Sequence, residues 1–152
     1  HSEDFTASYV LEGIIKKYSD FVSYPIRTKG EDGTIIAFNR IERIAAKNGG
    51  SGQNGNAINV FRAGNVIVRG NRIARAAFTA VRGNAASNIQ MVANSCSRLG
   101  EVALYAEFGF QGALIASNVV DTAAAGISVT NFNEGGRLAI VQGNLIRNLF
   151  LS

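Results

Sequence analysis

Apolar and polar positions along this chain follow a pattern that recurs at a near-constant interval between residues 33 and 149. One short sequence motif occurs five times, each time with an Asn at its centre. The copies are TIIAFNRIERI, VIVRGNRIARA, IQMVANSCSRL, ALIASNVVDTA and AIVQGNLIRNL. Aligned on the Asn, they are spaced by 32, 23, 24 and 26 residues. A period in this range predicts stacked structural repeats, with one insertion in the first interval.

The alignment produces three apolar columns, which lie three residues before the Asn, two after it and five after it. In that order the columns contain Ile36, Val68, Met91, Ile115 and Val141; Ile41, Ile73, Cys96, Val120 and Ile146; and Ile44, Ala76, Leu99, Ala123 and Leu149. A second short run follows each copy and contributes Ile58, Val81, Leu104 and Ile127. The residues next to that run are Asn59, Arg82, Tyr105 and Ser128. Alternation of this kind predicts short strands with one face turned inward.

Short strands, glycines at the corners and an Asn at one recurring bend predict an all-β fold. We expect a parallel β-helix, or β-solenoid, of about five turns over residues 27–152. In such a fold the strands of successive turns pair in register about 4.8 Å apart, so that equivalent residues lie directly above one another.

The recurring asparagines are predicted to form a ladder inside this solenoid. Stacked side-chain amides can hydrogen-bond along the axis and to the backbone of a bend. Because an amide is neither an acid nor a base, and because buried polar groups are normally hydrogen-bonded, we favour this structural interpretation over a catalytic one. The ladder would contain Asn39, Asn71, Asn94, Asn118 and Asn144.

Residues 1–26 follow a different pattern and are predicted to form an N-terminal helical cap segment. Apolar residues recur there at helical spacing, at Val10, Leu11, Ile14, Ile15, Tyr18, Phe21 and Val22. Pro25 disfavours a helical residue before it, so the helix should end by Tyr24. An amphipathic helix in this place would cover the open first turn of the solenoid, with Arg27 to Asp32 as the polar connection. The first residues do not have the pattern of a signal peptide.

Three phrases carry a resemblance to known proteins: GSGQNGNAINVFRAGNVIVRGNRI, AVRGNAASNIQ and NFNEGGRLAIVQGN. Residues from about 33 to 152 resemble the right-handed parallel β-helix of the pectate-lyase-like superfamily. More closely, they resemble an uncharacterised bacterial family of twin-arginine-exported repeat proteins. The resemblance implies right-handed winding and bacterial export to the periplasm or the cell exterior, and it implies little about chemistry.

A second resemblance concerns the segment YVLEGIIKKYSDFVSYPI, which is similar to the start of the middle domain in the ninety-kilodalton heat-shock chaperones. The matching segment has no nucleotide-binding domain, so it implies neither chaperone nor ATPase activity. Two unrelated resemblances in one chain lead to the hypothesis that the sequence is a mosaic or chimera.

Composition narrows the choice of function. The chain of 152 residues is long enough for one domain with a core, and it contains no apolar run that approaches a membrane span of about 18 residues. A single Cys excludes an intrachain disulfide, and the only His is His1. We therefore predict no metal site and no cofactor. The net charge of +4 is compatible with an acidic partner without requiring one.

The best candidates for chemistry are two carboxylates in adjoining loops, Glu107 in YAEFGFQ and Glu134 in TNFNEGG. Two carboxyl groups across a cleft are what hydrolysis of a sugar polymer needs. The candidate ligand-binding residues around them are Arg82, Tyr105, Asn131 and Asn133. The alternative is structural: Phe108 and Phe132 lie one period apart and would stack in a corner of the solenoid.

Arginines form a second candidate surface. Arg43, Arg75 and Arg98 share the position four residues after the Asn, and Arg40 and Arg72 share the position next to it. We favour a solvated polar face, and the alternative is a stripe that binds acidic polysaccharide. Nucleic acid is disfavoured, because aromatic residues do not alternate with these arginines.

The sequence therefore leads first to a structural or interaction module without catalytic activity of its own. The alternatives are a carbohydrate-binding or carbohydrate-cleaving protein acting through Glu107 and Glu134, and a basic polyanion binder. The stretch from Asn148 to Ser152 is still apolar and contains no polar closing segment. We expect a homodimer or a higher closed oligomer through residues 137–152, with Leu149, Phe150 and Leu151 at its centre.

Overall fold

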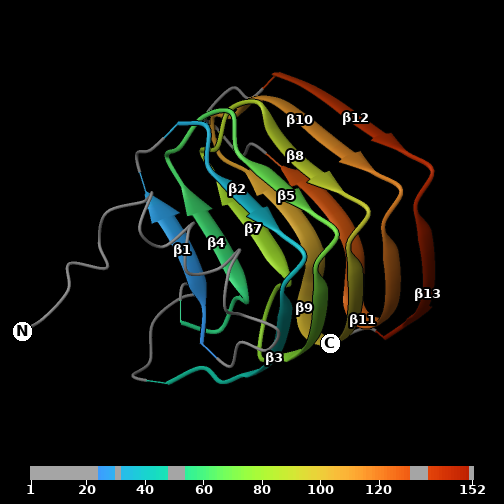
Figure 1. The fold of residues 1–152 in the computed structure, drawn as a ribbon. Coiled ribbons are helices and arrows are strands. Elements are labelled where there is room, and N and C mark those ends of the chain that lie inside the picture. The colour runs from blue at the N-terminus through green and yellow to red at the C-terminus, as the bar shows by residue number, and fades with distance from the viewer. Residues whose placement is uncertain (1–23, 30–31, 48–53, 131–136, 151–152) are drawn as a thin grey trace, which may run out of the picture.

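The computed structural model describes residues 24–29, 32–47, 54–130 and 137–150, and these residues form an all-β structure without a helix (Figure 1). The strands are β1 (Ile26–Lys29), β2 (Ile35–Ala37), β3 (Arg40–Ile44), β4 (Ile58–Phe61), β5 (Ile67–Arg69), β6 (Arg72–Ala76), β7 (Val81–Asn84), β8 (Ile89–Val92), β9 (Ser95–Glu107), β10 (Gln111–Ala116), β11 (Val119–Thr130), β12 (Arg137–Gln142) and β13 (Leu145–Leu149). Every pairing between these strands is parallel.

The strands wind into a coil with three faces. One face is a five-stranded sheet in the order β12-β10-β8-β5-β2. The other two faces belong to an eight-stranded sheet, in which the long strands β9 and β11 run through a corner. The first half of β9 pairs with β6, and its second half pairs with β7. The predicted parallel β-solenoid is thus confirmed, with four complete coils and a fifth that β12 and β13 begin (Figure 1).

The predicted apolar columns lie inside this coil in register. Ile36 pairs with Val68, and the same column continues through Met91 and Ile115 to Val141. These side chains are almost fully buried in the first four coils. Cys96 belongs to the next column, where burial raises the pKa of its thiol to about 12. This cysteine is therefore a core residue and not a reactive thiolate.

The corners of the coil require backbone conformations that non-glycine residues seldom adopt. The residue before each ladder Asn has positive φ, at Phe38, Gly70, Ala93, Ser117 and Gly143. The residue four after each Asn also has positive φ, at Arg43, Arg75, Arg98, Thr122 and Asn148. The arginines that share an offset in the sequence therefore mark a second bend in the first three coils, where Thr122 and Asn148 take the same place in the last two. Each left-handed non-glycine residue costs on the order of 1 kcal/mol or more, which neighbouring contacts must offset.

The five asparagines form a continuous ladder. In each of four links, the backbone N–H and the Nδ2 amide of one Asn both donate to Oδ1 of the Asn in the following coil, at 2.9 to 3.1 Å. The Nδ2 group also donates backward, as from Asn94 to the Val68 carbonyl at 3.0 Å. The amides of Asn71, Asn94 and Asn118 are at most 1% exposed. Their hydrogen-bonding capacity is used inside the protein, as burial requires.

The solenoid begins earlier than the sequence suggested. We expected a polar connection from Arg27 to Asp32, but Ile26–Lys29 forms β1 and pairs with β4. The reason is a short alternation, in which Ile26 and Thr28 are buried and Arg27 is exposed.

The helix and cap expected for residues 1–26 fall almost wholly on residues 1–23, outside the described part. That cap and the right-handed winding remain predictions. No described helix is long and apolar enough to cross a membrane.

Replacing the central ladder residue is expected to destabilise the fold. Asn94→Ala should lower the free energy of unfolding by about 1 to 3 kcal/mol, because the buried Asn71 N–H loses its acceptor and Asn118 Oδ1 loses one of its two donors. Denaturant unfolding measures this change. Gln90→Ala removes an exposed amide nearby and should change the free energy by less than about 0.5 kcal/mol. Equal effects of the two substitutions would contradict a stabilising role of the ladder.

Candidate functional site

Two neighbouring rows of outward-facing side chains cross the third face of the solenoid, which β1, β4, β7 and the second halves of β9 and β11 form. The first row contains Asn59, Arg82, Tyr105 and Ser128, one residue from each coil. The second row contains Phe61, Asn84, Glu107 and Thr130. Because the strands pair in register, the candidate residues Arg82, Tyr105 and Glu107 lie together on this face.

Glu107 is a buried carboxylate that accepts hydrogen bonds from two side chains of the preceding coil. Its residue is 2% exposed. Its Oε1 atom accepts hydrogen bonds from the Arg82 guanidinium and, at 3.0 Å, from the Asn84 amide. The Arg82 side chain is itself 18% exposed, so this ion pair is largely shielded from solvent. A buried charge of this kind stays in place only because its partner and its hydrogen bonds are present.

Tyr105 extends the same cluster. The Arg82 guanidinium lies over its ring, 5.8 Å from the ring centroid, which is within the range of a cation–π contact. The Tyr105 hydroxyl oxygen lies 3.3 Å from the Thr130 hydroxyl, which donates to it. Arg82 thus bridges the tyrosine of one row and the carboxylate of the other. Arg82, Tyr105 and Glu107 therefore form one connected cluster on this face of the solenoid.

The remaining candidates at this site lie outside the described residues. The segment 131–136 contains Glu134, Asn131 and Asn133, and also Phe132, which was expected to stack on Phe108. The pairing of Glu107 with Glu134 therefore remains a prediction. Asn84 was not among the candidates, although the sequence held a signal for it: it precedes Glu107 by 23 residues, which is one repeat period.

Arginines near the first coils form a second polar surface. Glu42 lies between two of them, 2.9 Å from Arg40 Nε and 3.6 Å from Arg75 Nη1. The hydrogen bond from Arg40, assisted by the charges of Arg40, Arg75 and Arg43, lowers the pKa of this carboxyl below its ordinary value. Part of the positive stripe expected from the sequence is therefore neutralised within the protein.

Three basic side chains line one pocket. Its volume is about 310 Å³, and Arg27, Arg43 and Lys47 line it together with Tyr24 and Asn54. The Arg27 guanidinium donates to the Asn54 side-chain oxygen at 2.7 Å. No carboxylate is among the described residues that line this pocket. Its chemistry suits an anion.

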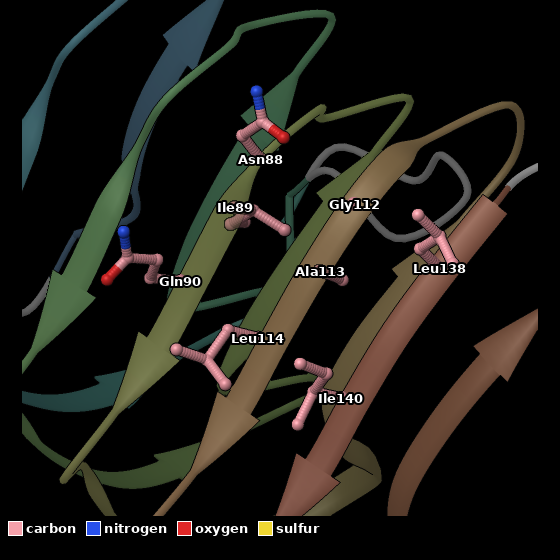
Figure 2. A pocket seen from close by; sticks show the side chains of 8 residues that line it. All are labelled: Asn88, Ile89, Gln90, Gly112, Ala113, Leu114, Leu138 and Ile140. Carbon is pink, nitrogen blue, oxygen red and sulfur yellow. The ribbon is translucent and has the colours of Figure 1, made fainter.

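A second depression lies on the outer surface of the five-stranded sheet. Figure 2 shows its lining side chains on β8, β10 and β12, and at Asn88 just before β8. It has a volume of about 260 Å³ and a mostly apolar lining that includes Leu114, Leu138 and Ile140. Leu138 is 86% exposed and has positive φ at a position where earlier coils have Gly33, Asn65, Asn88 and Gly112. The described residues that line this depression are neutral, so none of them is an acid or a base.

The end of the solenoid formed by β12 and β13 presents interior positions to solvent. Val141, Ile146 and Leu149 are 48%, 38% and 50% exposed. Their counterparts one coil earlier, Ile115, Val120 and Ala123, are all 0% exposed. Phe150, which follows β13, is 44% exposed. No coil among the described residues covers this end, and we call the surface made by Val141, Ile146, Leu149 and Phe150 the C-terminal end surface.

The last coil is held to the one before it by polar contacts as well as by strand pairing. Asp121 on β11 accepts hydrogen bonds from Asn148 at 2.8 Å and from Arg147 at 2.9 Å. These two bonds, with one from Thr122, lower the pKa of the Asp121 carboxyl below its ordinary value. The end surface therefore belongs to an ordered coil.

Comparisons of the chain with protein-family models, with curated proteins and with solved structures find no match. Within the described residues, His, Cys, Asp and Glu side chains form no group of three or more that could hold a metal ion.

Loss of the Arg82 guanidinium is expected to leave Glu107 charged and unpaired in a buried place. Arg82→Met should lower the free energy of unfolding by about 3 to 5 kcal/mol. Adding Glu107→Gln should restore most of that loss, because an amide keeps the acceptor for Asn84 without the charge. Denaturant unfolding of both variants measures the difference, with Arg72→Met as a control at an exposed arginine. A double variant as unstable as Arg82→Met would show that charge pairing is not what holds Glu107.

Proposed function

We propose that this chain is a structural or interaction module, a β-solenoid that associates through its C-terminal end surface. The observation that carries the proposal is the change in exposure of the three interior columns, from full burial in the fourth coil to between 38% and 50% in the fifth. Apolar surface of this kind, framed by the open edges of β12 and β13, favours pairing with further polypeptide.

The geometry of the polar cluster on the third face supports the same proposal. Glu107 would need an accessible carboxyl group to act as a general acid or base. Its Oε1 atom is already engaged by Arg82 and Asn84, and the residue is 2% exposed. A carboxylate held in this way stabilises a scaffold more readily than it transfers a proton.

Charge placed on the end surface is expected to prevent association. Light scattering across a dilution series should show the unmodified chain as an oligomer at micromolar concentration and Phe150→Glu as a monomer, because burying a carboxylate in an apolar contact is unfavourable. Phe38→Glu is the matched control, since Phe38 is 72% exposed on the first coil, far from this end. It should leave the oligomer intact. A chain that is monomeric at every concentration would contradict the proposal.

A basic polyanion binder is the second candidate, and the pocket between Arg27, Arg43 and Lys47 favours it. Three cations around one pocket, with no carboxylate among its described lining residues, can hold a sulfate or carboxylate group of an acidic polysaccharide. Such binding releases counterions and weakens steeply as salt rises.

Retention on immobilised heparin tests this second candidate. Arg43→Gln should shift elution to lower salt, because it removes a charge from the pocket. Arg98→Gln changes the same column of bends two coils away and should have a smaller effect. Equal shifts for the two variants would place binding along the whole stripe, and retention that is insensitive to salt would exclude polyanion binding.

A further inference from the structure

Phe38 is an exposed aromatic residue at the bend between β2 and β3. It is 72% exposed, and its φ is 61°. The residues at the same bend of the later coils are Gly70, Ala93, Ser117 and Gly143, all of which are small. A bulky residue in the left-handed region is a rare backbone outlier, and such outliers concentrate at sites that bind ligands. An aromatic ring is thus held in solvent at a position that the other coils fill with a small residue.

The second coil fixes the position of the Phe38 ring. The Phe38 backbone N–H donates to the Arg69 carbonyl at 3.2 Å, and the Arg69 guanidinium lies over the ring, 5.4 Å from its centroid. Gly70 leaves room for the ring, since a Cβ atom there would lie 2.7 Å from two of the ring carbons. With Arg69 over one face and 72% of the residue exposed, the other face of the ring is open to solvent.

Two more arginines lie beside the ring, on the strands that follow the bend. Arg40 on β3 and Arg72 on β6 are partners in register, and both are exposed. Glu42 accepts a hydrogen bond from Arg40, but among the described residues no carboxylate pairs with Arg69 or Arg72. Like charges directly opposite each other on neighbouring strands repel, and a bound anion relieves that repulsion.

We call the surface made by Phe38, Arg69, Arg40 and Arg72 the Phe38 corner. It combines an open aromatic face with guanidinium groups, two of which have no carboxylate partner among the described residues. Single-stranded nucleic acid matches both features, because a base can stack on an aromatic side chain while arginines bind the backbone phosphates. A duplex keeps its bases stacked on one another, and an acidic polysaccharide has no aromatic ring.

The sequence disfavoured nucleic acid because aromatic residues do not alternate with the arginines. Alignment of the repeats compares residues at equal offsets, and the equivalents of Phe38 are not aromatic. It therefore could not show that the fold brings Phe38 against Arg69 of the next coil.

We infer that the Phe38 corner binds single-stranded nucleic acid, with one base stacked on the open face of Phe38 and neighbouring phosphates bound by the three arginines. This surface shares no residue with the C-terminal end surface or with the pocket lined by Arg27, Arg43 and Lys47. The inference therefore goes beyond the proposed function and does not rest on it. Because every base has a face that can stack, binding should show little sequence preference.

A fluorescein-labelled strand of about ten thymidines is the probe, and fluorescence anisotropy at low salt measures its Kd. Phe38→Leu keeps an apolar side chain and removes the aromatic face, so it should weaken binding about tenfold. Phe61→Leu is the matched control, since Phe61 also stacks with an arginine, Arg62 at 5.0 Å, but is half-buried on the third face. It should change binding by less than about twofold. Equal losses in the two variants would overturn the inference.

An abasic strand of the same length separates stacking from charge in the unmodified chain. It keeps every phosphate and has no bases, so it should bind about tenfold more weakly than the thymidine strand, and Phe38→Leu should not weaken it further. Equal binding of the two strands by the unmodified chain would mean that charge alone holds them, and would overturn stacking on Phe38. This comparison needs no variant, so it stands even if Phe38→Leu perturbs the fold.

Arg72→Gln tests the contribution of the guanidinium groups. It should lower the slope of log affinity against log salt by about 0.7, the amount expected for one phosphate contact of a single strand. An unchanged slope would exclude a phosphate contact at Arg72. Circular dichroism of each variant checks that the fold is retained.

Failure of this inference can be told apart from failure of the proposed functions. Association through the C-terminal end surface is measured without oligonucleotide, so a monomeric chain would leave the Phe38 corner intact. Phe38→Leu should not shift elution from heparin, whereas Arg43→Gln should. If both variants shift elution equally, and the thymidine strand binds no better than the abasic strand, the Phe38 corner belongs to a polysaccharide surface and the inference is wrong.

Discussion

The structure depends on one constraint, which is that every coil must turn the same sharp corner at the same height. The corner needs a left-handed residue just before the Asn, and such a residue costs on the order of 1 kcal/mol or more unless it is Gly. The Asn offsets that cost, because its amide binds the coil before it and the coil after it. A one-residue slip would break these bonds and would also turn the apolar columns outward.

Stacking in register makes neighbours of residues that lie one period apart, and the polar surface is built from such pairs. Arg82 with Glu107, Arg75 with Glu42 and Arg147 with Asp121 all join adjacent coils. The carboxylates of Glu107, Glu42 and Asp121 are thus paired with arginines within the protein, whereas the end of the coil remains apolar and open. This contrast between paired carboxylates and an open apolar end is the basis for proposing an interaction at the end.

The solenoid and its interior columns could be predicted from the sequence, because apolar residues at fixed offsets leave few alternatives. The bends were harder to predict. Arg43, Arg75 and Arg98 share an offset, but nothing in an arginine indicates positive φ, so a corner was interpreted as a charged face. The burial of Glu107 was also missed, since it depends on Arg82 reaching across from the neighbouring row. Strand β1 was missed because four residues hold too short an alternation to outweigh their polar composition.

The direction of the ladder also bears on how the chain is made. A ribosome delivers each coil before the one that follows it, and each coil here pairs only with its neighbours along the axis. A newly emerged coil therefore meets a finished template whose donors already point toward it, so that folding can keep pace with synthesis. Each repeat that the ribosome adds then lengthens the solenoid by one coil.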